Sequence, residues 1–370
     1  MKAVILVGGE GTRLRPLTFT IPKPMIPLAN RPFLEHVVEY LKSHGIDDII
    51  LSMCYRPDVI ERHFGDGRGF GVKLTYVIES SPLGTAGGVK NVEKHLDGTF
   101  FVFNGDVLTD LDLTAMLRAH RDRGAKATLG LTPVEDPTAY GLVETHDDLR
   151  VKAFVEKPTW DRVTTNLINA GTYILEPEVL DHVPPDTFYM FERGLFPFLL
   201  QKGDPVYGFP SDAYWIDVGT PEKYLTVHRD LLSGRMSRAL PGRRLGEGIW
   251  VGEGCDIDSS ARLIGPIVLG DRVKIGEGTV LTGPLALGDN CTIGSHCTIE
   301  DAIVWPGTTI DSRVVMKHCV IGRNSAVGEN SWIAQGAVVA DRCTIGAGNR
   351  LEGAIKVSPN RSIEANTISF

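Results

Sequence analysis

The stretch that decides the fold of the N-terminal half runs from an apolar segment into a glycine-rich turn, Val4-Ile5-Leu6-Val7-Gly8-Gly9-Glu10-Gly11-Thr12-Arg13-Leu14-Arg15. The apolar residues predict a buried strand, and the glycines let backbone N–H groups approach a ligand closely. Successive backbone amides in such a turn form a concavity that binds anions. Arg13 and, further along, Lys23 carry cations suited to phosphate oxygens. We therefore predict that this turn binds phosphate groups.

The segment differs from the two commonest phosphate-binding loops. The dinucleotide-binding pattern G-x-G-x-x-G requires a third glycine where this chain has Leu14. The P-loop requires a glycine-lysine pair followed by a hydroxyl residue, and residues 4–24 contain no such pair. A different phosphate-binding architecture is therefore indicated.

Residues 1–235 alternate short apolar runs with helical patterns, which predicts an α/β domain. We expect a Rossmann-like, mostly parallel sheet with helices on both faces. Residues 48–53, 73–78 and 100–103 are predicted strands, and residues 85–96 a predicted helix. Ligands of open α/β sheets bind beyond the carboxyl ends of the strands. The glycine turn and Asp106 both occupy that position, which predicts a cleft there.

Composition narrows the function classes. The chain has 370 residues, 42% of them hydrophobic and 23% charged, with a net charge of −8. The negative charge and the lack of a basic run argue against nucleic-acid binding. No apolar stretch approaches the roughly 20 residues of a membrane span, and the apolar run before the glycines is too short for a signal peptide. We expect a cytoplasmic protein without nucleic-acid or membrane partners.

A six-residue repeat dominates residues 249–370, after a predicted linker at 236–248. Such a repeat predicts a solenoid of short parallel strands, with about six coils from Val251 to Val357. The periodic aliphatic residues are Val251, Ile257, Leu263, Leu269, Ile275, Leu281, Leu287, Ile293, Ile299 and Trp305, then Ile321, Val327, Ile333, Val339, Ile345, Leu351 and Val357. The 16 residues from Trp305 to Ile321 break the phase.

The repeat also explains most of the cysteines. Cys255, Cys291, Cys297 and Cys343 each lie four residues after a periodic aliphatic residue. This slot points inward and takes small residues, and free cysteine behaves as a small buried hydrophobe. We therefore expect neither disulfides nor a metal site from these cysteines.

The N-terminal motifs, in order, resemble those of the sugar-phosphate nucleotidyltransferases, and the repeat resembles the hexapeptide left-handed β-helix. The motifs are the glycine turn with Lys23, Asn104-Gly105-Asp106, Tyr140-Gly141, Glu156-Lys157-Pro158, Asn169-Ala170-Gly171 and Trp215-Ile216-Asp217. The resemblance implies an enzyme that joins a nucleoside triphosphate to a sugar 1-phosphate and releases pyrophosphate. Such a reaction needs positioning and charge neutralisation rather than covalent chemistry from the protein.

The resemblance also implies roles for individual residues. Asp106 and Asp217 would hold Mg²⁺ (or Mn²⁺), which takes one or two carboxylates and completes its shell with phosphate oxygens and water. Arg13, Lys23 and Lys157 are the predicted catalytic cations. The predicted sugar-phosphate residues are Gly141, Glu156, Lys157 and Asn169. The predicted nucleotide residues are Leu6, Gly8, Gly9, Gly11, Thr12, Glu79, Gly84, Thr85 and Asn104. The carboxylate of Glu79 either accepts from a guanine amino group or is a solvated loop acid.

Within the family, the motif forms look most like the mannose-1-phosphate guanylyltransferases, which favours GTP and mannose 1-phosphate. Thymidylyl- and uridylyltransferases that act on glucose 1-phosphate are the alternatives. A regulatory paralogue without turnover is a second alternative. A third adds acyl transfer in the β-helix, with His296 or His318 as the catalytic histidine. Stacked coils leave exposed ends and flat faces, so we expect the chain to form homo-oligomers.

Overall fold

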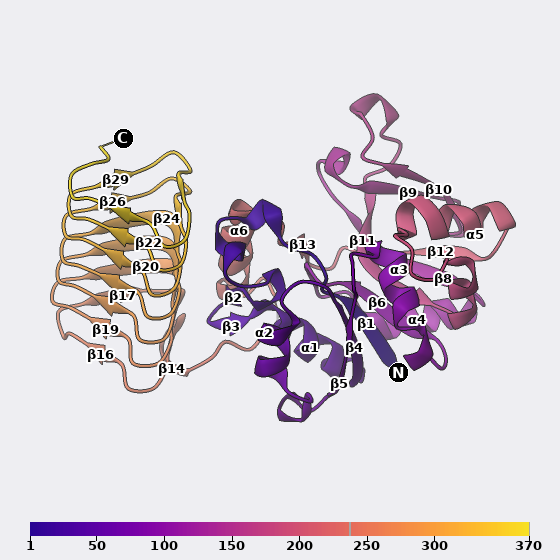
Figure 1. The fold of residues 1–370 in the computed structure, drawn as a ribbon, viewed down its shortest axis with the longest axis horizontal. Helices are drawn as coiled ribbons and strands as arrows, with labels where there is room; N and C mark the ends of the chain where they lie inside the picture. The colour runs from indigo at the N-terminus through magenta and orange to yellow at the C-terminus, as the bar shows by residue number, and fades with distance from the viewer. Residues whose placement is uncertain (237, 370) are drawn as a thin grey trace. The chain divides into compact units, whose positions relative to one another are not determined.

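A computed structural model describes residues 1–236 and 238–369 (Figure 1). Contacts divide the chain into two compact units. The first contains Met1–Gly9 and Val37–Asp217, and the second contains Glu10–His36 and Val218–Phe370. The predicted catalytic half therefore contributes to both units, since Glu10–His36 groups with the C-terminal residues. The predicted linker 236–248 also includes a strand, β14 (Arg243–Gly246).

The first unit is built on a mixed sheet with the order β10-β9-β11-β6-β1-β4-β5. Strand β8 also pairs with β11, and β12 pairs with β8. Strands β6, β1, β4 and β5 are parallel, whereas β11 runs antiparallel to β6. The strands are β1 (Lys2–Leu6), β4 (Asp48–Met53), β5 (Lys73–Ile78), β6 (Phe100–Asn104), β8 (Ala127–Pro133), β9 (Gly141–Thr145), β10 (Val151–Glu156), β11 (Leu167–Leu175) and β12 (Val206–Pro210). The parallel half carries the glycine turn, as predicted.

The helices of this unit are α2 (Pro57–Phe64), α3 (Gly84–Asn91), α4 (Leu113–Asp122) and α5 (Phe196–Lys202), while α1 (Phe33–Ser43) spans the division between the units. Strands 48–53 and 73–78 are confirmed, and the strand predicted at 100–103 extends to Asn104. The helix predicted over 85–96 is shorter, because a 3-10 turn at Glu93–His95 follows α3. Gly87 and Gly88 lie within α3, and glycine is a poor helix former.

The C-terminal part of the second unit is a parallel β-helix (Figure 1). Most coils contain 18 residues, as the pairs Val251 with Leu269 and Val339 with Val357 show. Its strands are β15 (Ile249–Val251), β16 (Asp256–Ile257), β17 (Arg262–Ile264), β18 (Ile267–Leu269), β19 (Lys274–Ile275), β20 (Val280–Leu287), β21 (Thr292–Ile293), β22 (Thr298–Val304), β23 (Thr309–Ile310), β24 (Val315–Ile321), β25 (Ala326–Val327), β26 (Trp332–Ile333), β27 (Val338–Val339), β28 (Thr344–Ile345), β29 (Arg350–Leu351), β30 (Lys356–Val357) and β31 (Ser362–Ile363). The six coils predicted between Val251 and Val357 are confirmed.

The phase predicted at Trp305 is wrong. Val304 pairs with Leu287 on one side and with Ile321 on the other, 17 residues away in each case. Val304 therefore occupies the core position, and two five-residue steps, ending at Val304 and at Ile321, replace the predicted break. Trp305 is still buried, but its indole Nε1 donates to the hydroxyl of Tyr224, 3.0 Å away. A buried aromatic side chain outside the β-helix core thus mimicked the repeat.

The predicted inward position of the cysteines is confirmed. Cys291, Cys297 and Cys343 are buried in the β-helix core, and Cys255 packs against that core. Their thiols donate to backbone carbonyls of the following coil: the Sγ of Cys291 lies 3.3 Å from the carbonyl oxygen of Trp305. Thr279 and Ser325 occupy the same slot and make the equivalent bond to Gly294 and Ala340. Burial raises the pKa of the Cys291 thiol to about 11, which makes it a weak nucleophile.

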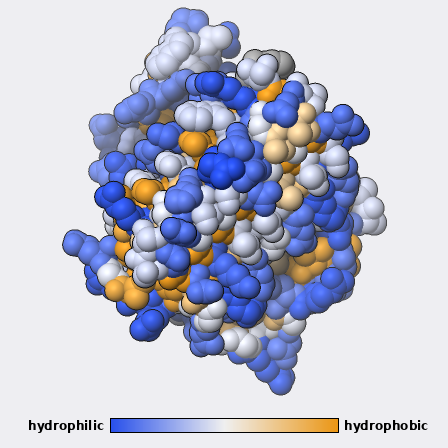
Figure 2. Space-filling model, turned by 90° about the vertical axis from the view of Figure 1, so that its left-hand side faces the viewer, coloured by the Kyte–Doolittle hydropathy of each residue, from blue (hydrophilic) through white to orange (hydrophobic). Residues whose placement is uncertain are grey.

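Helix α6 (Pro221–Leu232) and the hairpin of β2 (Pro27–Leu28) and β3 (Arg31–Pro32) pack with the β-helix in the second unit. The side chain of Tyr224 on α6 is fully buried, and its hydroxyl donates to the carbonyl oxygen of Pro27. On the face of the β-helix in Figure 2, hydrophobic residues are scattered among hydrophilic ones. Among the described residues, no helix is both long enough and apolar enough to cross a membrane.

Candidate functional site

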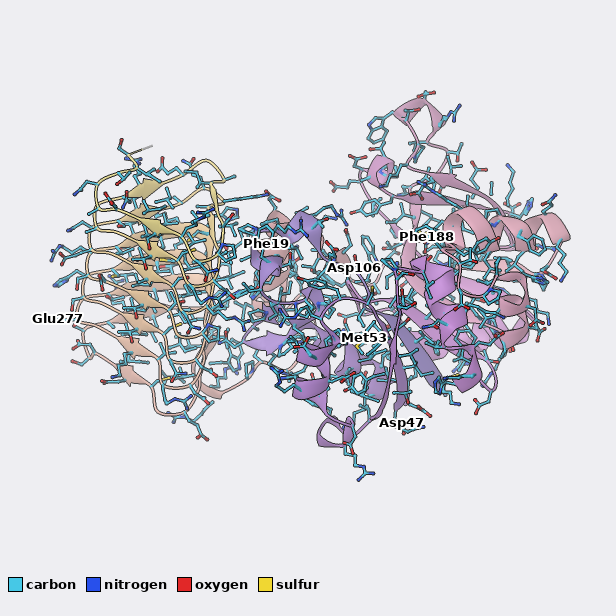
Figure 3. The ribbon with its side chains drawn as sticks, viewed as in Figure 1. Phe19, Asp47, Met53, Asp106, Phe188 and Glu277 are labelled. Atoms are coloured by element: carbon cyan, nitrogen blue, oxygen red, sulfur yellow. The ribbon has the colours of Figure 1, made fainter. Side chains whose placement is uncertain are left out.

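The predicted site residues of the first unit gather at one edge of its sheet. Asp47 and Met53 lie at the amino and carboxyl ends of β4, and Asp106 lies on the side of Met53 (Figure 3). The parallel register of β1 with β4 and β6 brings Leu6, Ser52 and Asn104 to the same level. The glycine turn that follows Leu6 and the acid that follows Asn104 are therefore neighbours. They meet at the carboxyl ends of the strands, where the sequence placed the glycine turn and Asp106.

A two-stranded ribbon brings the two predicted metal ligands together. Strand β13 (Trp215–Asp217) pairs antiparallel with β7 (Val107–Thr109), and Asp217 lies opposite Val107. Asp106, which immediately precedes Val107, therefore lies beside Asp217 although 111 positions separate them in the chain. The hydroxyl of Tyr140 donates to Oδ1 of Asp217 at 2.9 Å. This bond orients the carboxylate, which is 9% exposed.

Asp106 and Asp217 fit a magnesium site in which the protein supplies only two of the ligands. Among the described residues, no group of three or more histidine, cysteine, aspartate or glutamate side chains is placed to hold a metal by itself. Mg²⁺ characteristically uses one or two carboxylates together with substrate phosphates and water. Asp106 and Asp217 supply that number of hard oxygen ligands. The donor set therefore suits an ion that arrives with a nucleotide better than a resident structural metal.

The first part of the glycine turn is open. A Cβ atom built on Gly9 would meet nothing within 4 Å, and one on Gly8 would make only ordinary contacts with Cys54 and Glu79. The carbonyl oxygen of Leu6 accepts from the N–H of Gly105 at 2.9 Å, which ties β1 to the segment before Asp106. None of the residues that the structure describes therefore crowds the Cβ positions of Gly8 and Gly9, as a phosphate cradle requires.

The remaining predicted phosphate residues belong to the second unit. Gly11 has φ +63°, and its carbonyl oxygen accepts from the Thr18 hydroxyl at 2.8 Å. Thr12 opens the 3-10 turn Thr12–Leu14, which contains Arg13. A Cβ built on Gly219 would lie 3.0 Å from the Arg13 guanidinium, so the guanidinium packs closely against this glycine. Lys23 is 8% exposed, which is unusual because lysine is rarely buried unless it is paired.

Three of the predicted sugar-phosphate residues meet on the hairpin of β9 and β10. Gly141 pairs with Glu156, and a Cβ built on Gly141 would lie 2.9 Å from the Glu156 carboxylate. Lys157 has φ +45°, and its backbone N–H donates to the carbonyl oxygen of Tyr140 at 3.0 Å. This strained backbone places an exposed lysine next to an exposed acid.

Asn169 is held by residues that the sequence prediction missed. Its Nδ2 donates to the hydroxyl of Tyr173 at 2.8 Å and to Oε1 of Glu192 at 3.3 Å. Its Oδ1 accepts from the N–H of Gly171 at 3.1 Å. Glu192 lies on a π-helical turn, Phe191–Leu195, a feature that is frequent at functional sites. Local sequence carries no signal for such a turn.

The same turn links Asn169 to Glu156. Arg193 on this turn lies 3.8 Å from Oε1 of Glu156. Burial raises the pKa of the Glu192 carboxyl group, and the charge of Glu156 raises it further. Burial also raises the pKa of Tyr173 well above its ordinary value. The predicted sugar pocket is therefore bordered by a protonatable acid whose environment disfavours negative charge.

The predicted base-binding residues are largely occupied by protein contacts. Glu79 is buried rather than solvated, and its two carboxylate oxygens accept from the Ser52 hydroxyl and the Leu83 N–H. The Thr85 hydroxyl accepts from the N–H of Phe191 at 2.9 Å. Gly84 has φ +73° and packs against Tyr189. These contacts shape the loop, so base recognition by Glu79 would require it to exchange internal partners.

Asn104 has a different environment from Glu79 and Thr85. A Cβ built on Gly171 would collide with its Nδ2 at 2.6 Å, so Gly171 leaves room for the amide. Its Oδ1 is buried and accepts no hydrogen bond from the residues described. A buried acceptor in this state is costly to leave unsatisfied. Among the residues that the structure describes, none therefore satisfies this acceptor of Asn104.

The two histidines considered for acyl transfer lie at corners of the β-helix. His296 has φ +56° and belongs to a column that also contains Gly278, Arg313, Asn330, Gly348 and Asn366, all with positive φ. His318 has φ +49°, and its Nδ1 lies 2.7 Å from Oδ2 of Asp301. A left-handed corner recurs at this position from Gly278 to Asn366, and its occupants have no chemistry in common. The position of His296 is therefore explained by the turn.

Comparisons with known proteins cover both parts of the chain. Residues 2–234 match the family model described as Nucleotidyl transferase, and residues 246–351 match the one described as EIF2B subunit epsilon LbH domain, a left-handed β-helix. Mannose-1-phosphate guanylyltransferase of Mycobacterium tuberculosis is 46% identical over 277 residues, 74% of this chain and 76% of that protein. UTP–glucose-1-phosphate uridylyltransferase of Synechocystis is 35% identical, over 88% and 90% of the two chains.

A solved structure is also similar. HddC from Yersinia pseudotuberculosis, complexed with GMP-PN, is 35% identical with a TM-score of 0.53, over 61% of this chain and 97% of its own. The family matches agree with the predicted fold class of an α/β nucleotidyltransferase core and a left-handed β-helix. Members of the nucleotidyl transferase family generally use a divalent metal. The match of residues 2–234 to the family model and the 46% identity to a family member show that the chain belongs to this family.

Proposed function

We propose that this chain transfers a guanylyl group from GTP to mannose 1-phosphate, forming GDP-mannose and pyrophosphate. The observation that carries the chemistry is the pairing of β7 with β13, which brings Asp106 and Asp217 together beyond the parallel strands. The preference for guanine and mannose is supported by the higher identity to the guanylyltransferase than to the uridylyltransferase. It is also supported by the guanine nucleotide in the similar solved structure.

The reaction is a displacement at the α-phosphorus of GTP. A phosphate oxygen of mannose 1-phosphate forms the new bond, and the bond to the bridging oxygen of pyrophosphate breaks, so that pyrophosphate carries the electron pair away. Arg13 and Lys23 would neutralise the leaving pyrophosphate, and Lys157 would hold the phosphate of the sugar. Asp106 and Asp217 would hold a Mg²⁺ ion, which supplies charge neutralisation on the nucleotide when bound.

The protein orients these groups through its own hydrogen bonds. Tyr140 holds the carboxylate of Asp217 through its hydroxyl and receives the N–H of Lys157 at its carbonyl oxygen. One residue thereby links the predicted metal ligand with the predicted sugar-phosphate lysine. Tyr173 and Glu192 fix the amide of Asn169. Such preorganisation lowers the cost of orienting the substrates when the reaction occurs.

The decisive experiment is a grid of five nucleoside triphosphates against several sugar 1-phosphates, scored by pyrophosphate release with Mg²⁺ present. We expect the highest kcat/KM for GTP with mannose 1-phosphate. Preference for UTP or dTTP with glucose 1-phosphate would overturn the substrate assignment but not the family chemistry. Binding of GTP without turnover in any combination would support the regulatory alternative. Within the active combination, Lys157→Ala is expected to raise the KM for the sugar phosphate and Lys23→Ala that for GTP.

A further inference from the structure

The β-helix holds the segment that carries the phosphate-binding cations. Glu10–His36, which includes Arg13 and Lys23, belongs to the same compact unit as the β-helix. Side-chain hydrogen bonds from β-helix residues, or from α6, reach this segment on both sides of Lys23. The contacts of each side use different coils and different chemistry.

On the N-terminal side of Lys23, the contact is a short charge-assisted hydrogen bond. The hydroxyl of Thr20 donates to Oδ2 of Asp341 at 2.6 Å. Asp341 is 1% exposed, and its Oδ1 accepts from the backbone N–H of Arg323 at 2.9 Å. The guanidinium Nε of Arg323 lies 3.3 Å from Oδ2. Bonds of this type to a buried carboxylate are among the stronger polar interactions in proteins.

On the C-terminal side, a relay of hydrogen bonds reaches the hairpin. Trp305 of the β-helix donates to the hydroxyl of Tyr224, which itself donates to the carbonyl oxygen of Pro27. Nδ2 of Asn30 donates to the carbonyl oxygen of Leu287 at 2.7 Å. The guanidinium of Arg323 lies over the Trp305 ring, 5.4 Å from its centroid, and so connects this side with Asp341.

The repeat shows which part of Asp341 is specific to this contact. Asp271 and Asp289 occupy equivalent positions in earlier coils, where one carboxylate oxygen accepts the N–H of Glu253 and of Asp271 respectively. Asp341 makes the same bond to Arg323 with Oδ1. Its other oxygen accepts from Thr20, outside the β-helix. The coil-to-coil bond explains the aspartate, and the Thr20 bond adds a second task.

We propose that Asp341 is a positioning residue for nucleotidyl transfer, which acts through Thr20 on the backbone that places Lys23. By this means the β-helix sets the affinity of the enzyme for the triphosphate. The inference rests on the proposed function in one respect, the role of Lys23 in holding the leaving pyrophosphate. It gives the C-terminal half a part in catalysis, whereas the repeat by itself pointed to the formation of homo-oligomers.

Three variants of the full-length protein test the proposal: Thr20→Val, Asp341→Asn and the double variant. Thr20→Val removes the donor and leaves the β-helix untouched. Asp341→Asn keeps an oxygen for the Arg323 N–H and replaces the acceptor for Thr20 with an amide NH₂. Asp289→Asn is the matched control, because the bond that it alters lies within the β-helix. Pyrophosphate release gives kcat and both KM values, and thermal unfolding is followed in parallel.

We expect Thr20→Val and Asp341→Asn each to raise the KM for GTP about five- to tenfold, the loss of one charge-assisted hydrogen bond. The KM for the sugar phosphate should stay within about twofold of wild type in both, and the double variant should be no worse than either single one. Asp289→Asn should leave both KM values unchanged.

Unchanged KM for GTP in Thr20→Val would overturn the proposal, and so would an equal rise in Asp289→Asn. Lys23→Ala in the same assay separates the two hypotheses. If Lys23→Ala weakens GTP use while Thr20→Val does not, the positioning role fails and the proposed function stands. If Lys23→Ala has no effect, the assignment of the cation itself is at fault.

Discussion

Buried polar groups obtain their hydrogen-bond partners differently in the β-helix and at the carboxyl edge of the sheet. In the β-helix core, the small inward donors Thr279, Ser325 and Cys343 each donate to a backbone carbonyl oxygen of the next coil. At the sheet edge, partners come from distant segments, and Oδ1 of Asn104 and Oε2 of Glu192 are buried without a partner among the described residues. The repeat therefore satisfies these core donors, whereas the meeting of distant segments at the sheet edge leaves two buried acceptors available for a ligand.

The largest expected effect is at the sheet edge, with Asp217→Ala. We predict that kcat for pyrophosphate release falls about 10²- to 10³-fold. The substitution removes one of the two carboxylates expected to hold the Mg²⁺ ion that neutralises charge in the transition state. Asp212→Ala, an exposed acid just before β13, is the control and should keep near-normal turnover. The melting temperatures of both variants should stay close to that of wild type. Near-normal kcat in Asp217→Ala would refute the assignment of this metal ligand.

The second prediction concerns the β-helix. Ile299→Ala should destabilise it by about 2–5 kcal/mol, because Ile299 is fully buried in the core and the coils around it cannot collapse freely. Ile264 is 44% exposed, so Ile264→Ala should lower the free energy of unfolding by less than about 0.5 kcal/mol. Chemical denaturation gives both values. Equal losses would mean that the six-residue register does not decide which side chains form the core.

The third prediction concerns the pH dependence of stability that His228, a buried residue of the second unit, should cause. Burial lowers the pKa of His228 from 6.5 to about 3, an effect to which His36 adds, while the bond to the Tyr224 carbonyl opposes it. The ring is neutral, since Nε2 accepts from the Ala29 N–H and Nδ1 donates to Tyr224. Below pH 6.5 the unfolded state binds a proton that the folded state does not, so stability falls as the pH falls towards 3.

At pH 5 this loss amounts to about 2 kcal/mol relative to pH 7. The measurement is denaturant unfolding at both pH values for the wild-type protein and His228→Gln, whose amide can replace both ring contacts without titrating. The variant should lose less stability between pH 7 and pH 5 than wild type. An identical pH dependence would show that His228 does not contribute to it.

The smallest expected effect is that of Tyr140→Phe. This change removes the hydroxyl that orients Asp217 but keeps the edge-to-face contact with Trp215, whose ring centroid is 5.5 Å away. The loss of one hydrogen bond should lower kcat about fivefold. Steady-state kinetics with saturating substrates measures it. A loss as large as that of Asp217→Ala would instead indicate that Tyr140 contacts the substrates directly.

Much of the fold could be read from local patterns. Short apolar runs predicted the strands at 48–53 and 73–78, and the six-residue repeat predicted the inward cysteines. Both patterns depend on nearby residues alone. The error at Trp305 has a physical cause. A large apolar residue fits the pattern of a buried position equally well whether it faces the interior of the coil or α6. Glu192 and Tyr173 were missed because a π-helical turn and a strand interior carry no functional signal until they face Asn169.

The sequence by itself determined the glycine turn, the order of the motifs and the six-residue period, because each depends on the conformational preferences of short segments. Only the tertiary structure decided that Asp106 and Asp217 are neighbours, since that follows from the pairing of β7 with β13. It likewise decided that Thr20, beside the predicted pyrophosphate site, is bonded to Asp341, which no local preference of the chain encodes.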